Sequence, residues 1–373
     1  MRPSTPCVGA CRLNERGICV GCGRTVEQIA AWGEMDEIER QRIMRVLAGS
    51  ESATPSEAAA LAVASGPCIV SLLPSATEMA FALGLGDNVV GVSHECDFPP
   101  AAKSRRSVVR AALALQGMTQ RQIDAAVSQR VREGNSLYEI DEALLQQMRP
   151  DLILTQNLCQ VCAPSGKQLV DALRSLSPRP DVLAMTPRTL GDILENMREL
   201  GRATGREAVA QELIESYRER LARIRTTLPR NLPHKRVFFM EWADPIYSGG
   251  HWVPEMVELA GGIDALARSG QNSVRVAWED VLRWAPELLV VAPCGCDVSG
   301  ALEQLPTLTA LPGWSSLPAA RHGQVICVDA NSFFARPGPR VIEGVELLAH
   351  LINPVLFGWP GPKDAYRPIH ESA

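Results

Sequence analysis

Residues 206–228, REAVAQELIESYRERLARIRTTL, decide how this chain is organised. Their apolar side chains recur at helical spacing and form one stripe, which is typical of a long amphipathic helix. The stripe consists of Val209, Leu213, Tyr217, Leu221 and Ile224. A preceding helix is expected from about Leu190 to Gly205. Because α/β patterns stand on both sides of this segment, the sequence predicts two lobes joined by a long, rigid helix.

Strand-like runs alternate with helical segments before the long helix. Four buried strands are expected, at residues 68–72, 89–92, 152–155 and 181–184. Two Ser-x-x-Glu patterns predict capped helix starts, one at Ser75 and Glu78 and one at Ser136 and Glu139. A helical stretch is expected between the second and third strands.

The same alternation returns after the long helix, with strands expected at residues 236–240, 288–291 and 324–328. Alternation of this kind predicts parallel sheets with helices on both faces. The fold class is therefore α/β, with two Rossmann-like lobes. The expected boundaries are residues 67–188 for lobe one, 189–228 for the bridging helices, 235–351 for lobe two and 352–373 for a C-terminal tail.

A cysteine-rich unit is expected at residues 1–48, before a small, polar linker at residues 49–66. Its four thiols follow the pattern Cys-x3-Cys-x7-Cys-x2-Cys, and they are Cys7, Cys11, Cys19 and Cys22. Short helices are expected from Thr25 and from Met35. Two short helices cannot close a core at this size, so a bound metal is expected to hold the unit together. Four thiolates suit zinc or an iron–sulfur cluster equally well.

The composition limits the function classes. The chain has 373 residues, is 46% hydrophobic and carries a formal net charge of -5, which argues against nucleic-acid or anionic-membrane binding. The first residues lack an apolar signal-peptide core, and no run is long enough to span a membrane. A cytoplasmic location is therefore expected. Eleven cysteines favour metal, cluster or redox roles over a disulfide framework.

Five further thiols follow the ends of predicted strands. Ligands of open α/β sheets lie outside the carboxyl ends of the strands, so these thiols are expected to meet at a cleft between the lobes. They are Cys96, Cys159, Cys162, Cys294 and Cys296. They could ligate a soft metal, hold a cluster, donate to cobalt or act as a redox pair. The alternative is that they are small buried hydrophobes, which is the interpretation preferred for Cys68 and Cys327.

A glycine-rich loop, YSGGHWVPE at residues 247–255, precedes an expected helix at Pro254. The free amides of a helix start, with His251 beside them, could hold an anionic or amide group of a ligand. A tight strand-to-helix turn explains the glycines equally well.

Short segments of the second unit resemble one known family in collinear order. They are SLLPSATE at 71–78, GVS at 91–93, DFPP at 97–100, PDLI at 150–153, and Arg336 with Pro339 and Arg340. Over residues 67–351 the chain resembles solute-binding proteins with a rigid helical bridge, which serve metal ions, siderophores and cobalamin. The resemblance is greatest to cobalamin-binding proteins of bacterial ABC importers.

This resemblance implies a non-enzymatic binding protein whose ligand lies between the lobes. The implied ligand-facing residues are His94, Trp242, Tyr247, Phe333, Phe334 and Arg336. Aromatic walls with few polar anchors suit a corrinoid, a large flat macrocycle with amide arms. The family also docks on its transporter through two glutamates, here Glu78 and Glu258, although a helix cap explains Glu78 as well.

The four-cysteine unit resembles a small bacterial family described as predicted Fe–S proteins, and a protein partner through this unit is one role that it could serve. The leading hypothesis is a cytoplasmic protein that binds cobalamin, another corrinoid or a related metal chelate. The alternative is a metal or iron–sulfur redox protein or enzyme that uses the cleft cysteines.

Overall fold

The computed structural model describes residues 18, 19, 22, 24–32, 35, 40, 43, 44, 66–156, 169, 172–174 and 176–369. The chain forms two compact units, Met1–Ser65 and Gly66–Ala373. In the first unit, helix α1 (Val26–Ala31) begins with a reciprocal capping box between Thr25 and Gln28. The helix predicted to start at Thr25 is confirmed. The linker and most of the helix predicted after Met35 lie outside the described residues.

Lobe one is built on a six-stranded sheet with the order β4-β3-β2-β1-β5-β6. The four strands predicted from the sequence are confirmed as β1 (Ile69–Ser71), β2 (Val89–Ser93), β5 (Leu152–Thr155) and β6 (Asp181–Ala184). These strands pair in parallel. Strand β3 (Arg106–Ala111) extends the parallel part, whereas β4 (Tyr138–Ile140) pairs with β3 antiparallel.

Two local predictions in lobe one are wrong. The stretch predicted to be helical contains the helices α5 (Gln120–Arg132) and α6 (Glu142–Met148), but also β3 and β4, and Ser136 precedes β4 instead of capping a helix. Asp141 caps α6 (Glu142–Met148) through the Leu144 N–H. Helix α4 (Pro74–Ala82) is preceded by Leu73 at the cap position, two residues before the predicted cap Ser75, and has no side-chain cap. The Glu78 side chain is therefore available for another partner.

The remaining helices of lobe one are short, except for α5 (Gln120–Arg132) between β3 and β4. Thr119 and Gln122 form a capping box at the start of α5. Single 3-10 turns occur as η2 (Gly86–Asn88) and η3 (Pro100–Ser104).

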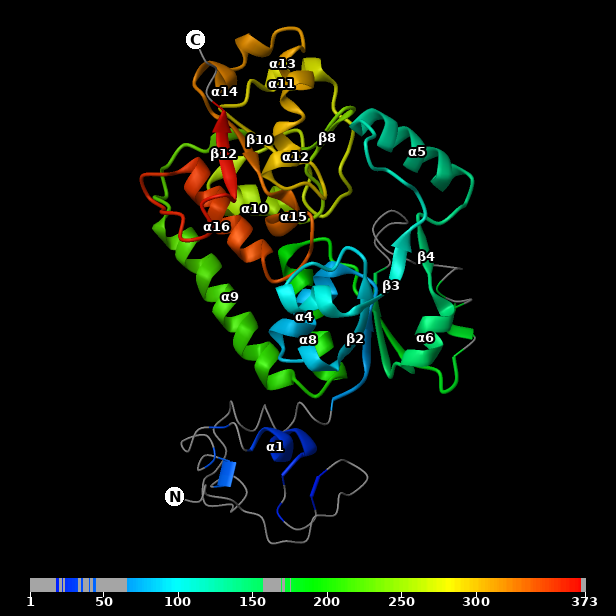
Figure 1. The fold of residues 1–373 in the computed structure, drawn as a ribbon. Coiled ribbons are helices and arrows are strands. Elements are labelled where there is room, and N and C mark those ends of the chain that lie inside the picture. The colour runs from blue at the N-terminus through cyan, green and yellow to red at the C-terminus, as the bar shows by residue number, and fades with distance from the viewer. Residues whose placement is uncertain are drawn as a thin grey trace. The chain divides into compact units, whose positions relative to one another are not determined.

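The predicted bridge consists of α8 (Leu190–Ala203) and the 21-residue α9 (Glu207–Thr227). The chain turns between them at Gly205, whose φ of +68° favours glycine. Helix α9 runs along one side of both lobes (Figure 1). Its predicted apolar stripe is confirmed, because Ile224 is buried and the other stripe residues pack against the core.

Lobe two has a second six-stranded sheet, in which β12-β11-β10-β7-β8 are neighbours and β9 pairs with β7. Its strands are β7 (Lys235–Ala243), β8 (Ile246–Ser248), β9 (Gly262–Ile263), β10 (Leu288–Val291), β11 (Val325–Val328) and β12 (Tyr366–Ile369). The three predicted strands correspond to β7, β10 and β11. Strand β12 lies within the predicted C-terminal tail and pairs antiparallel with β11. Both sheets are therefore mixed.

Helices cover the second sheet on both faces. They are α10 (Val253–Leu259), α11 (Trp278–Trp284), α12 (Val298–Leu302), α13 (Leu305–Thr309), η4 (Trp314–Ser316), α14 (Pro318–Arg321), α15 (Ala330–Phe333) and α16 (Val341–Ile352). Alternate strand residues face different apolar layers: Leu288 and Val290 join one cluster, and Leu289 and Val291 join another.

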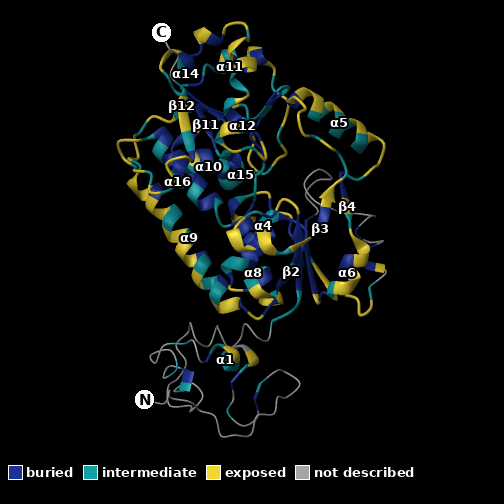
Figure 2. Ribbon diagram, in the orientation of Figure 1, coloured by how far each residue is buried: buried dark blue, intermediate teal, exposed yellow. Residues whose placement is uncertain are grey.

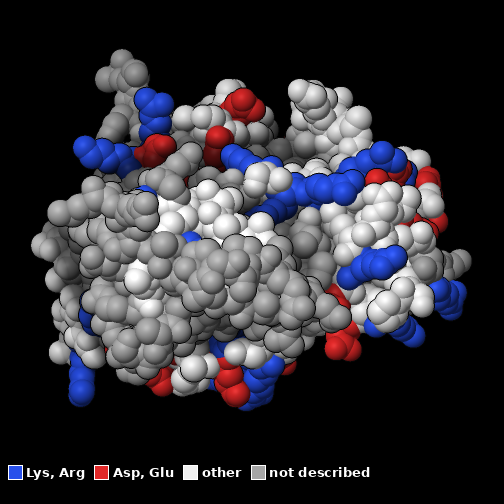
Figure 3. All heavy atoms as spheres, turned by 60° about the horizontal axis from the view of Figure 1, so that its bottom comes forward, with Lys and Arg blue, Asp and Glu red and all other residues white. Residues whose placement is uncertain are grey.

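One apolar cluster continues from lobe one into lobe two. It joins Ile69 of β1 and Met79 of α4 to Phe239 of β7 and Val345 of α16. The buried strands and inward helix faces are visible in Figure 2. This shared core explains why residues 66–373 form one compact unit. Basic and acidic side chains are interspersed on the face drawn in Figure 3, in keeping with the small net charge.

Candidate functional site

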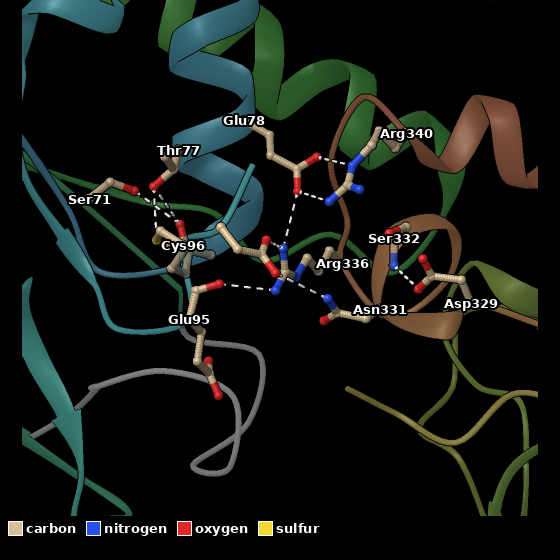
Figure 4. Close-up of polar contacts among 12 residues, drawn as sticks. Ser71, Thr77, Glu78, Glu95, Cys96, Asp329, Asn331, Ser332, Arg336 and Arg340 are labelled. Atoms are coloured by element: carbon tan, nitrogen blue, oxygen red, sulfur yellow. Dashed lines mark hydrogen bonds and ion pairs between the residues drawn. The ribbon is translucent and has the colours of Figure 1, made fainter. Parts of the chain in front are cut away.

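A cluster of four charged residues joins the two lobes, and we call it the interlobe ion cluster: Glu78, Asp97, Arg336 and Arg340. Glu78, Arg336 and Arg340 are labelled in Figure 4. Arg340 donates two hydrogen bonds to the Glu78 carboxylate, from Nε at 2.9 Å and from Nη2 at 2.6 Å. Only 2% of the Glu78 side chain is exposed. The implied role of Glu78 as an exposed docking residue therefore does not fit this arrangement, whereas Glu258 is exposed.

Arg336 completes this cluster on the lobe-two side. Its guanidinium pairs with Asp97 and donates to the Glu95 carbonyl at 3.0 Å. It also lies 3.6 Å from the Glu78 carboxylate. In this structure Arg336, which the resemblance placed among the ligand-facing residues, thus pairs with lobe one.

The two carboxylates of the cluster have opposite pKa shifts. Burial raises the pKa of Glu78, and the neighbouring Arg340 and Arg336 offset this only in part. Burial also raises the pKa of Asp97, but the hydrogen bond and charge of Arg336 outweigh it and hold that pKa below its usual value. The difference follows from exposure, because 42% of the Asp97 side chain is in contact with solvent.

Two of the quoted motifs meet at the ion cluster, which explains their residue types. In the RPGPR segment, a Cβ on Gly338 would lie 3.3 Å from Glu78 Oε2 and 3.4 Å from Ser75 Cα. Glycine at this position therefore lets the RPGPR segment approach helix α4 closely. In the DFPP segment, the Phe98 ring lies 4.2 Å beneath the Arg340 guanidinium, a cation–π contact. The motifs therefore encode contact between the lobes.

The first turn of α5 makes a second polar contact between the lobes, which we call the α5 contact. Gln120 Oε1 accepts from the N–H groups of Ala243 and Asp244, at 2.8 Å and 3.2 Å. Arg121 donates to both oxygens of the Asp244 carboxylate, at 3.0 Å and 2.7 Å. One turn later, Asp124 accepts from Arg275 Nη2 at 2.6 Å.

This contact holds the β7–β8 hairpin, which carries two of the predicted aromatic residues. Trp242 and Tyr247 are both half-buried and pair across the hairpin. The Tyr247 hydroxyl accepts from Arg275 at 2.8 Å and donates to Asp124 at 3.4 Å. Trp242 Nε1 donates to the Asp244 carbonyl. Both residues keep part of their surface exposed to solvent.

Phe333 and Phe334 differ from this expectation. Phe334 is 2% exposed and packs edge-on against Phe239 at 5.1 Å between ring centroids. Phe333 is 4% exposed and meets Trp359 in the same manner. Both belong to the continuous apolar core. The structure places them in the packing of lobe two, because α15 turns both rings inward.

The two predicted histidines lie apart. His94 follows β2, is exposed, and lies 3.1 Å from the Val109 carbonyl through Nδ1. His251 is half-buried beside Asn272, 3.1 Å from its Oδ1, and burial lowers its pKa. A Cβ on the preceding Gly250 would meet Ser273 N at 2.3 Å, so that glycine is required by a close backbone approach. A tight turn between strand and helix is therefore sufficient to explain the glycine in this loop.

Two surface hollows flank the contacts between the lobes. One, of about 1050 Å³, opens where β10 and β11 end, and includes Phe98 of lobe one with Asp329, Phe333 and Arg340 of lobe two. The other, of about 590 Å³, lies between the α5 face carrying Val127 and Val131 and the Arg275 side chain. Both volumes are in the range of small-molecule sites.

The predicted cleft thiols do not gather among the described residues. Cys96 is 5% exposed, lies 3.1 Å from Thr77 Oγ1, and burial raises its pKa to about 11. Cys294 is exposed and Cys296 is half-buried. Cys159 and Cys162 lie outside the described residues. No group of three or more potential ligands is arranged around a metal in the part of the chain that the structure describes.

Half of the N-terminal cysteine set can be placed. Cys19 is buried, Cys22 is half-buried, and a bridge between Ile18 and Thr25 encloses them in a small hairpin. The Cys19 N–H donates to the Arg24 carbonyl, and Arg24 Nε donates to Cys22 Sγ at 3.4 Å. Cys7 and Cys11 lie outside the described residues.

Sequence reasoning missed the residues of the α5 contact and the partners of the ion cluster. Gln120, Arg121 and Asp124 sit in a polar helix and give no local signal. The pair Arg336 and Arg340, separated by Pro-Gly-Pro, was a visible signal. Its partner Glu78 lies 262 residues away in the chain, so no local pattern could identify it.

Comparisons with known proteins place this geometry in context. Residues 69–331 match the family described as "Periplasmic binding protein", and residues 5–51 match "Protein of unknown function (DUF1289)". The chain is 28% identical to the uncharacterized ABC transporter substrate-binding lipoprotein YvrC of Bacillus subtilis, over 78% of this chain and 81% of that protein. It is 27% identical to the vitamin B12-binding protein of Vibrio cholerae, over 74% of this chain and 86% of that protein.

Solved structures agree. The periplasmic vitamin B12 binding protein BtuF of Vibrio cholerae matches with a TM-score of 0.56 and 26% identity, over 77% of this chain and 96% of that one. A periplasmic heme binding protein from Pseudomonas aeruginosa matches with a TM-score of 0.59 at 20% identity, over 81% of this chain and 98% of that one, and this likeness concerns the fold alone. None of the described helices is long and apolar enough to cross a membrane. The match over residues 69–331 shows that this chain belongs to the periplasmic binding protein family, a family of non-enzymatic solute-binding proteins of the ABC-transporter type.

Proposed function

We propose that this chain binds a corrinoid between its two lobes, at the surface that the β7–β8 hairpin presents to lobe one. The observation that carries the proposal is the likeness to vitamin B12-binding proteins in both sequence and structure, over about three quarters of the chain. Heme is the second candidate ligand, because proteins of similar fold bind it.

The site chemistry supports a large, mainly apolar ligand with polar edges. Trp242 and Tyr247 offer partly exposed rings on the hairpin, and aromatic faces bind flat macrocycles well. The hydrogen bonds of the α5 contact and of the ion cluster join opposite lobes. The ion pairs of the α5 contact are largely exposed and can open to admit a ligand, while the buried ion cluster and the shared apolar core hold the lobes together.

An absorbance titration tests the proposal. The purified full-length chain is titrated with hydroxocobalamin and, separately, with hemin, and the visible bands are followed. We expect a saturable change with hydroxocobalamin. Trp242→Ala should weaken binding at least about tenfold, since it removes a large contact surface. Trp284→Ala is the matched control, because Trp284 donates to the Val237 carbonyl on another face of lobe two. Full affinity of Trp242→Ala would remove the hairpin from the site.

We also propose a metal at the N-terminal cysteines, supported by the spacing of the four cysteines and by the bridge between Ile18 and Thr25, which stand on either side of Cys19 and Cys22. Bound metal per chain is measured in the full-length protein purified without oxygen. We expect one equivalent of zinc or one iron–sulfur cluster, lost in Cys19→Ser and Cys22→Ser but retained in Cys327→Ser. Equal metal content in all variants would contradict the proposal.

The cytoplasmic location stays a prediction. It is checked by fractionating cells that produce the full-length chain and detecting the protein in each compartment. Recovery outside the cytoplasm would contradict it.

A further inference from the structure

One buried donor between the lobes has no partner. Gln120 is 6% exposed, and within the described part of the chain its Nε2 atom makes no hydrogen bond. Its Oε1 atom, in contrast, accepts from two backbone N–H groups of lobe two. Leaving a buried amide donor unpaired is unfavourable, and native proteins rarely do so without a reason.

The orientation of this amide is fixed by its partners. The N–H groups of Ala243 and Asp244 lie 2.8 Å and 3.2 Å from the same side-chain atom, and only the oxygen can accept them. Exchanging the two ends of the amide would set an NH2 group against two donors. The unpaired atom is therefore a donor, and a group that satisfies it must be an acceptor.

The location connects this donor to the proposed ligand site. Gln120 extends from lobe one, and its amide contacts the residues immediately after Trp242 on the lobe-two hairpin. Since Nε2 is shielded from solvent in this arrangement, an acceptor can reach it only when it is enclosed between the lobes. A ligand taken up while the α5 contact is open would meet this requirement.

The charges nearby indicate which acceptor is favoured. Arg121 is paired with Asp244 at 2.7 Å, and Arg275 with Asp124 at 2.6 Å. Two positive and two negative groups leave no surplus positive charge to attract an anion. A neutral carbonyl oxygen is therefore a better partner for Gln120 than a carboxylate is.

We propose that Gln120 is a specificity-determining residue whose Nε2 donates a hydrogen bond to a peripheral carboxamide oxygen of the ligand. This inference rests on the proposed function and deepens it. The site would select a macrocycle with amide arms over one with carboxylate arms. The same amide, through Oε1, would couple ligand contact to closure of lobe two on lobe one.

The test compares ligands that share a macrocycle but differ at its edge. Cobinamide carries peripheral carboxamides and cobyrinic acid carries carboxylates, while hemin is a different macrocycle with carboxylates. Each is titrated against the full-length wild type and two variants. Gln120→Glu keeps an oxygen for both lobe-two N–H groups but loses the donor. Gln120→Met loses all polar contacts at similar size.

Gln122→Glu is the matched control. It makes the same substitution two residues away on α5, at an exposed side chain that serves the capping box. Glutamate suits that box as well as glutamine does, so folding and ligand binding should not change. Thermal unfolding of each variant identifies any that fails to fold.

We expect wild type to prefer cobinamide to cobyrinic acid. Gln120→Glu should bind cobinamide at least about tenfold more weakly, Gln120→Met about three- to tenfold more weakly, and Gln122→Glu as wild type does. Equal cobinamide affinity in wild type and both Gln120 variants would overturn this inference while leaving corrinoid binding intact. Preference of the wild type for cobyrinic acid or hemin would overturn the choice of a carboxamide. Binding of none of the three, with no change on titration with hydroxocobalamin either, would overturn the proposed function, and this inference with it.

Discussion

The interlobe ion cluster and the α5 contact join the same two lobes with the same kinds of groups, but they differ in exposure. In the ion cluster the side chains of Glu78 and Arg340 are 2% and 11% exposed. In the α5 contact those of Arg121 and Arg275 are 76% and 58% exposed. The pair distances are alike, so geometry does not separate the two contacts. Solvent does, because water screens exposed charges and burial makes an unpaired charge costly.

The comparison indicates that the two contacts have different roles. A buried cluster that loses one member should destabilise the whole unit, so it is suited to holding the lobes in register. In the α5 contact Gln120 is buried, but the exposed ion pairs can break and re-form at little cost, so this contact is suited to the edge where a ligand enters. Substitutions in either contact should therefore lower stability, but by amounts that differ between the ion cluster and the α5 contact.

Arg340→Ala should have the largest effect. It removes both hydrogen bonds to the Glu78 carboxylate and leaves that group buried beside Arg336 alone, 3.6 Å away. Removing one partner of a buried pair typically costs 3–5 kcal/mol, and the remaining Arg336 places the expected loss at about 3 kcal/mol. Urea unfolding monitored by circular dichroism measures this loss.

Arg220→Ala provides the control for that substitution. Arg220 makes two hydrogen bonds to Glu346, at 2.8 Å and 2.6 Å, but both side chains are 22% exposed. The expected loss is smaller, about 1 kcal/mol. If the two variants lose equal stability, burial does not distinguish the ion cluster and the comparison is wrong.

Much of the fold could be predicted from the sequence, since it rests on local pattern. The runs that became β1, β2, β5, β7, β10 and β11 are short and apolar, and the stripe of α9 repeats every helical turn. Strands β3 and β4 were missed, because exposed residues such as Arg106 on β3 and Glu139 on the edge strand β4 interrupt the buried-strand pattern.

The site was predicted less well, for a physical reason. Trp242 and Tyr247 do lie together on a hairpin, but Phe334 faces the core. The sequence around an aromatic residue does not show whether its side chain will be partly exposed or will pack in the core. Glu78 fitted a helix cap by spacing, yet its partner is Arg340, far along the chain. Contacts between lobes depend on tertiary pairing, which one sequence without comparison does not encode locally.

Asp97→Asn should have an intermediate effect within the same cluster. Asparagine keeps an acceptor for Arg336 but loses the charge that strengthens that hydrogen bond. Because the Asp97 side chain is 42% exposed, the expected loss of unfolding free energy is about 1 kcal/mol, well below that of Arg340→Ala. A loss as large as that of Arg340→Ala would show that exposure within the cluster does not matter.

The pH dependence of stability should separate the two carboxylates. Burial raises the pKa of Glu78 above 4.5, so its contribution is complete below pH 4.5 and falls as pH rises through the folded-state pKa. The pKa of Asp97 is held below 3.8 by Arg336 against the opposing effect of burial. Its contribution is present above pH 3.8 and is lost as pH falls through the folded-state pKa.

Unfolding free energies of wild type, Glu78→Gln and Asp97→Asn, measured from pH 3 to 7, check these signs. Glu78→Gln should remove part of the decline above pH 4.5, and Asp97→Asn part of the decline below pH 3.8. Parallel curves for all three proteins would mean that neither carboxylate changes its pKa on folding.

Arg121→Ala should have the smallest effect on stability and the clearest dependence on salt. Its pair with Asp244 is exposed on the Arg121 side, and such pairs contribute about 0.2–1 kcal/mol. The change in unfolding free energy should therefore stay below about 1 kcal/mol and vanish in 1 M salt, where the screening length is about 3 Å.

If the ion pair between Arg121 and Asp244 holds the edge where a ligand enters, its loss should still raise the rate of ligand dissociation at low salt. Arg110→Ala, which breaks the exposed pair with Glu139 inside lobe one, should leave that rate unchanged. If Arg121→Ala lost as much unfolding free energy as Arg340→Ala, and the loss persisted in 1 M salt, the proposed ranking of the two contacts by their contribution to stability would be wrong.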